Sequence, residues 1–95
     1  MNIGVFKLVT GEEVIAKFDA ALETYSLTNP RVLTPVQTGH GQFAVALVPW
    51  FVGIPDARDI AIRKADVIAH IPSVPKALED NYLQQTSGLD LTSRM

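Results

Sequence analysis

The stretch VFKLVTGEEVIAKF, residues 5–18, decides the fold class. Its first half is rich in β-branched and aromatic residues, and the residues TGE at 10–12 then supply a turn. After the turn, Val14, Ala16 and Phe18 occupy every second position, which is the pattern of a strand with one buried face. The stretch therefore predicts two neighbouring strands joined by a tight turn.

The chain continues as short strands separated by turns as far as residue 71. A third strand is bent or interrupted at residues 29–30, Asn-Pro, because proline cannot donate to a sheet ladder. A hairpin tip at residues 38–41 leads into an apolar run at 43–48, which we expect to be covered on both faces. Pro49 is expected to end this strand or to place it on an edge of the sheet. Five or six strands with short turns predict an antiparallel meander or a small barrel.

The end of the chain changes to a helical period. Its apolar stripe is formed by Leu78, Tyr82 and Leu83. We expect a helix over about residues 74–86, with Ser73 as its N-cap and Gly88 as its stop signal. Residues 87–95 are then a loosely held tail, and the whole chain, 1–95, is a single domain.

The composition indicates contacts with other chains. Of the 95 residues, 47% are hydrophobic and only 19% are charged, although a small domain has much surface to cover with polar groups. Residues 32–55 contain no Asp, Glu, Lys or Arg. A segment with Gln and Gly residues interrupts them, and the apolar part that remains is too short to span a membrane. We therefore expect part of this apolar surface to be buried against other chains.

Catalysis and metal binding find no support in the residue pattern. The chain has no cysteine, which excludes a disulfide scaffold and a thiol nucleophile. His40 and His70 have no partner nearby in the sequence for a triad or a metal site. We therefore expect a non-enzymatic protein with no cofactor, no metal and no small-molecule substrate. The N-terminus does not resemble a signal peptide, so a cytoplasmic location is expected.

Two places in the chain are suited to nucleic acid. Arg63 and Lys64 form a cationic pair at a turn, and the ring of Tyr25 is of the kind that stacks on a base. A solvated surface turn and a core tyrosine are the alternative interpretations. Because the net charge is −2, any attraction for phosphates must be local and sensitive to salt.

Two segments resemble the sequence motifs of Sm and Sm-like proteins. KLVTGEEVIA, residues 7–16, is similar to the first motif, and IRKADVI, residues 62–68, is similar to the second. Four further segments resemble the Sm-like proteins of marine cyanophages and related T4-like phages. They are LVTGEEV (8–14), NPRVL (29–33), ALVPW (46–50) and YLQQTSG (82–88).

The resemblance implies a strongly bent, five-stranded antiparallel barrel that assembles into a homo-oligomeric ring by pairing of edge strands. In such a ring we expect Val48, Trp50 and Phe51 to lie at the interface between subunits. It also implies binding of single-stranded RNA or DNA, with Tyr25 as the stacking residue and Arg63 as the second-motif arginine. Ser26 stands where the family has asparagine, and Lys64 stands where it has glycine. The implied setting is the cytoplasm of a phage-infected bacterial host.

Two functions follow as expectations. The first is a ring that binds single-stranded nucleic acid through Tyr25, Ser26, Arg63 and Lys64, with a role in RNA or DNA processing during infection. The alternative is a structural or protein-interaction ring that binds no nucleic acid.

Overall fold

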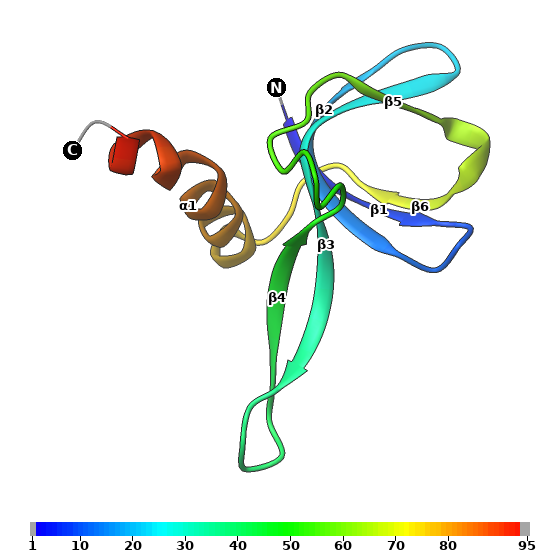
Figure 1. Cartoon of the computed structure of the whole chain (residues 1–95). Coiled ribbons are helices and arrows are strands. Elements are labelled where there is room, and N and C mark those ends of the chain that lie inside the picture. The colour runs from blue at the N-terminus through cyan, green and yellow to red at the C-terminus, as the bar shows by residue number, and fades with distance from the viewer. Residues whose placement is uncertain (1, 94–95) are drawn as a thin grey trace.

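The computed structural model describes residues 2–93 and contains one antiparallel sheet and one C-terminal helix (Figure 1). The strands are β1 (Asn2–Leu8), β2 (Glu13–Ala20), β3 (Thr24–Gln37), β4 (Phe43–Pro49), β5 (Ile60–Arg63) and β6 (Val67–Ile71). A single 3-10 turn, η1 (Lys64–Asp66), joins β5 to β6, and the helix is α1 (Lys76–Ser93). The predicted mostly-β class with a C-terminal helix is confirmed.

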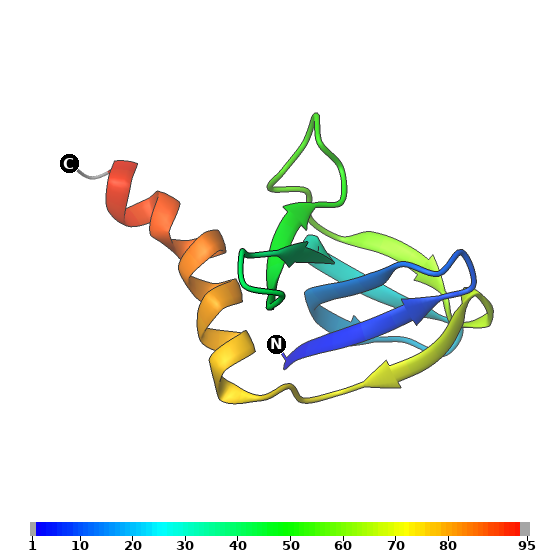
Figure 2. The ribbon, with the colours of Figure 1, turned by 90° about the horizontal axis from the view of Figure 1, so that it is seen from below.

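The long strand β3 gives the sheet its shape. β2 pairs along most of one side of β3, whereas on the other side the first half of β3 pairs with β5 and the second half with β4. Between the halves, Asn29 has a positive φ of 52°, and the register with β2 shifts between Ile15 and Lys17. The bend lets one part of the sheet curl while β3 and β4 project from it as a two-stranded ribbon (Figures 1 and 2).

The loop between β4 and β5 is tied to this bend. Asn29 donates its N–H to the carbonyl of Ala57, and Trp50 donates its N–H to the carbonyl of Pro30. The buried Arg31 guanidinium donates from Nη1 to the carbonyl oxygens of Pro55, at 2.7 Å, and Pro30, at 3.3 Å. These bonds position Trp50 beside the curled part of the sheet.

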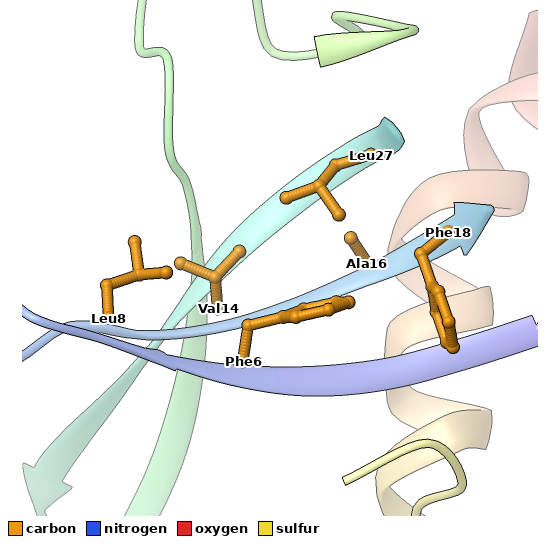
Figure 3. Close-up of a cluster of buried hydrophobic side chains, with 6 residues drawn as sticks. All are labelled: Phe6, Leu8, Val14, Ala16, Phe18 and Leu27. Carbon is orange, nitrogen blue, oxygen red and sulfur yellow. The ribbon is translucent and has the colours of Figure 1, made fainter. Parts of the chain in front are cut away.

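The inner face of the curl holds one hydrophobic core. Its buried members come from β1, β2 and β3, and they are Phe6, Leu8, Val14, Ala16, Phe18 and Leu27 (Figure 3). They occupy alternate positions of their strands, as the period-2 pattern predicts. The burial predicted for Val14, Ala16 and Phe18 is therefore confirmed. The prediction of only one buried face was wrong, because Ile15 on the other face of β2 is also buried, where α1 packs on the sheet.

The outer face of the sheet is covered by α1. Ile15, Leu47 and Tyr82 form a second buried cluster, with partly buried Ile3, Val5, Leu33, Val74, Leu78 and Leu83 around it. The Tyr82 hydroxyl accepts the N–H of Lys17 at 3.2 Å and lies 2.9 Å from the carbonyl oxygens of both Thr28 and Asn29. It therefore satisfies backbone groups at the irregular register of β2 and β3.

The sheet differs from the expected five-stranded barrel in its number of strands and in being open. The sheet has six strands in the order β4-β3-β2-β1-β6, with β5 paired to β3, and its hydrogen-bonded ladder is open over residues 2–93. Because η1 interrupts the extended chain, β5 and β6 are separate short strands that pair with different neighbours.

The helix and the apolar run also differ from the sequence-based predictions. The Pro75 carbonyl accepts the N–H of Glu79, so α1 begins at Lys76 and Ser73 is not its N-cap. The helix passes through Gly88 to Ser93, since one glycine weakens a helix by only about 1 kcal/mol. The predicted tail is thus helical to residue 93, and its last two residues lie outside the described part of the chain.

The run at residues 43–48 is not covered on both faces. β4 lies at the edge of the sheet, where Leu47 is buried but Val45 and Val48 are exposed. β4 lies at the edge because, within residues 2–93, β3 is the one strand that pairs with it. The expectation that Pro49 ends this strand or places it on an edge is confirmed, since β4 ends at Pro49 and lies at the edge.

Candidate nucleic-acid interface

The pairing of β3 with β5 brings the four predicted binding residues together. Tyr25 lies opposite Ile62, Ser26 lies opposite Ala61, and Arg63 lies opposite Thr24. Lys64 follows directly, and its N–H donates to the carbonyl of Glu23 at 2.9 Å. However, successive side chains of a strand point to opposite faces, so Ser26 does not share a face with Tyr25.

The ring of Tyr25 is engaged within the protein. It lies 4.9 Å from the ring of Phe6, 5.0 Å from that of His70 and 6.1 Å from that of Phe18, measured between centroids. The Lys64 ammonium lies 5.0 Å from the Tyr25 centroid as a cation–π partner. Tyr25 is half-buried, and the Lys64 ammonium lies over its ring.

His70 is the polar member of this aromatic cluster. Its ring stacks on Phe6 at 4.3 Å with an interplanar angle of 5°, and its Nε2 atom is buried without a hydrogen-bond partner among the described residues. Burial, with a smaller contribution from the positive charge of Lys64, lowers the pKa of His70 below its ordinary value of 6.5. The cluster therefore favours neutral imidazole.

We expect acid to destabilise the fold through His70. Because the pKa of His70 is lower in the folded chain, the unfolded chain binds more protons, and stability falls as the pH drops through 6.5 toward the folded pKa. Above that window the contribution of His70 is constant. Urea denaturation at pH 5.0, 6.0 and 7.5 measures the effect.

The matched controls for this prediction are two single variants. His70→Phe keeps a ring in the cluster and is expected to flatten the dependence of stability on pH. His40→Gln removes the chain's other histidine, at the exposed hairpin tip, and is expected to leave the dependence of stability on pH unchanged. An unchanged pH dependence in His70→Phe would contradict the assignment.

Arg63 is exposed and paired with a carboxylate. Its Nε and Nη2 atoms donate to Asp66 at 2.8 and 3.2 Å, and the two side chains are 76% and 41% exposed. A pair this exposed contributes little to stability, because water and salt screen it. The guanidinium can therefore exchange Asp66 for a phosphate at little cost.

Two hollows flank Arg63. The Trp50 cleft, of about 450 Å³, is lined by apolar residues that include Leu8, Trp50 and Ile62 and by the charged residues Glu12, Arg63 and Asp66. The Lys64 hollow, of about 420 Å³, is lined by Leu22, Glu23, Thr24, Arg63, Lys64 and Ala65. Arg63 thus contributes to the walls of both.

Trp50 is fixed within its cleft by hydrogen bonds. Its indole Nε1–H donates to Glu12 Oε2 at 3.0 Å, and the other oxygen of Glu12 accepts the hydroxyl of Thr10 at 2.6 Å. Sequence reasoning missed this role, because Glu12 and Trp50 are 38 positions apart and no local pattern connects them. The single tryptophan after Pro49 was the only available signal.

The three predicted interface residues lie in different surroundings. Val48 is exposed on the edge strand β4, and Phe51 is exposed in the loop that follows it. Trp50 is half-buried instead and packs against the inner core, 5.2 Å from the ring of Phe51. Of the three, Val48 and Phe51 are the more accessible to another subunit.

The sequence was compared with protein families and with curated proteins. No protein-family model matches the sequence, and no curated protein matches it. Within residues 2–93, no helix is long and apolar enough to cross a membrane, and no three His, Asp or Glu side chains gather as metal ligands.

Proposed function

We propose that the protein is an Sm-like ring subunit that binds single-stranded nucleic acid, with RNA as the first candidate. The observation that carries the binding proposal is the exposed turn at Arg63 and Lys64, held beside Tyr25 by the pairing of β3 with β5. The two cations contact phosphates there, and an aromatic side chain stacks on a base. Repetition around a ring multiplies these weak contacts.

The two ends of the sheet support assembly. β4 and β6 end the main strand order, while β5 pairs with β3 beside it. Both β4 and β6 carry exposed β-branched residues: Val45 and Val48 on β4, Ile68 and Ile71 on β6. Unpaired strand edges of this kind readily pair with another chain, and β4 has no charged residue to prevent it. Pairing of β4 with β6 of the next subunit is head-to-tail, which closes into a ring when the rotation permits.

A ring that binds no nucleic acid is the second candidate. It is favoured by the contacts that already occupy the site, since Arg63 is paired with Asp66 and Tyr25 is packed among three rings. In either case the implied setting remains the cytoplasm of a phage-infected bacterium.

Binding of a fluorescently labelled oligo(U) separates the two candidates. We expect Arg63→Ala/Lys64→Ala to weaken binding at low salt while the oligomer stays intact. Each phosphate contact with a single strand contributes about 0.7 to the slope of log K against log salt, so losing two contacts lowers the slope by about 1.4 per contacting subunit. Fluorescence anisotropy over a salt series measures both quantities.

The control is the double variant Lys7→Ala/Lys76→Ala. It removes the same two charges from exposed positions outside the site, where Lys7 pairs with Glu13 and Lys76 with Asp80. Its affinity should stay much closer to that of the unmodified protein. Absence of oligo(U) binding at low salt by an intact ring would refute the nucleic-acid proposal and leave the structural ring.

A further inference from the structure

A stacking site for a base needs an aromatic ring with an accessible face. Tyr25 offers little of one, because three rings pack around it and the Lys64 ammonium lies by its face. Trp50 is also half-buried, but it lines an open cleft of about 450 Å³. This volume is within the usual range for small-molecule sites.

The Trp50 indole is held in a fixed orientation before any ligand binds. Its N–H is bonded to Glu12, and Glu12 is bonded in turn to Thr10. The ring also packs on the inner core. Stacking on a ring already held in place loses little conformational freedom, so more of the contact energy contributes to affinity.

The charges of the cleft separate a base from a phosphate. Glu12 and Asp66 contribute carboxylates to the lining of the cleft, which repel a phosphate but accept hydrogen bonds from the amino and imino groups of bases. Arg63 lines both this cleft and the Lys64 hollow. If Arg63 turns from Asp66 to a phosphate, it also frees the Asp66 oxygens for a base.

We propose that the Trp50 cleft seats a nucleobase of the bound single strand, stacked on the Trp50 indole, with the adjoining phosphate at Arg63 and Lys64. This inference rests on the proposed nucleic-acid binding and names the base-binding residue within it. It moves the principal stacking role from Tyr25 to Trp50.

The chain's only tryptophan reports directly on this cleft. Oligo(U) is titrated into the protein while Trp50 emission and the anisotropy of a labelled strand are followed in parallel. The control ligand is an abasic strand of the same length, which carries the phosphates without the bases. We expect oligo(U) to change Trp50 emission and the abasic strand to leave it nearly unchanged at equal occupancy.

Substitutions test how much the Trp50 indole contributes to the affinity for oligo(U). Stacking of one base on an aromatic side chain corresponds to about a 5- to 150-fold change in affinity, so Trp50→Leu should weaken oligo(U) binding within that range. Val52→Ala, in the same loop but exposed and outside the cleft, should not. Circular dichroism checks that both variants fold, and the emission experiment on the unmodified protein needs no variant.

The possible outcomes separate the inference from the proposed function. Binding of oligo(U) with unchanged Trp50 emission would overturn the inference and leave nucleic-acid binding standing. Absence of oligo(U) binding would contradict both the inference and the proposed nucleic-acid binding. Emission that depends on protein concentration and not on oligo(U) would also overturn it, because the cleft would then be a contact between subunits.

Discussion

Replacing Tyr82 by alanine is expected to lower the free energy of unfolding by about 3–5 kcal/mol, and replacing it by phenylalanine by about 1–3 kcal/mol. The alanine variant leaves a cavity where a fully buried ring joins α1 to the sheet. The phenylalanine variant keeps the ring but leaves the Lys17 N–H and the carbonyl oxygens of Thr28 and Asn29 without the hydroxyl. For 95 residues the total stability is about 5–14 kcal/mol, so the first loss is a large fraction of it.

Urea denaturation followed by circular dichroism measures these losses. The matched control is Gln84→Ala, an exposed position on the same helix, which should change stability by less than about 0.5 kcal/mol. Equal stabilities for Tyr82→Phe and Gln84→Ala would show that the hydroxyl bonds contribute nothing.

Replacing Gly4 by alanine is expected to destabilise the protein by about 1–3 kcal/mol. A methyl group there would lie 2.8 Å from the carbonyl oxygen of Ile71 and 2.8 Å from Cε1 of Phe18, and 3.1 Å from Nε2 of His70. Because the first of these atoms is backbone of the paired strand β6, the sheet itself has to move. The same displacement disturbs the aromatic cluster around Tyr25.

Gly53→Ala is the matched control for this substitution. Gly53 lies in the exposed loop after β4, and a methyl group there meets no atom within 4 Å. It should therefore be neutral, or slightly stabilising through the unfolded chain. If Gly4→Ala unfolds at the same urea concentration as Gly53→Ala, the close approach of β1 to β6 is not a packing constraint.

Local pattern was sufficient for the strands of the inner core. Alternation identified the inner buried face of β2 but not the burial of Ile15 on its opposite face, which depends on the distant helix α1. The predicted glycine turn before β2 is confirmed, since Gly11 has a positive φ of 99°. The bend at residues 29–30 was also predicted, because a proline cannot complete a ladder. These features depend on neighbours in sequence.

The remaining features depend on contacts between distant parts of the chain. Tyr82 looked like one member of an apolar stripe, but its hydroxyl completes a sheet irregularity 53 to 65 residues away. The cluster around Tyr25 gathers rings from four strands, and that reduces the exposure of the predicted stacking residue. No periodicity within a short window encodes either contact.

Part of the arrangement of the candidate site follows from the sequence. Tyr25, Ser26, Arg63 and Lys64 are adjacent as expected, because β3 pairs with β5. The pairing of Arg63 with Asp66 and the position of Trp50 beside Arg63 were not foreseen. The second arises because the loop of residues 50–59 folds back onto the bend of β3, and its bonds to that bend have no sequence signature.

Light scattering coupled to size-exclusion chromatography tests ring assembly most directly, because it gives the mass in solution without a calibration for shape. Pairing of β4 with β6 between subunits predicts one species at micromolar concentration whose mass is a whole multiple, three or more, of the 10.3 kDa chain. A single species at 10.3 kDa under the same conditions would contradict assembly through these edges.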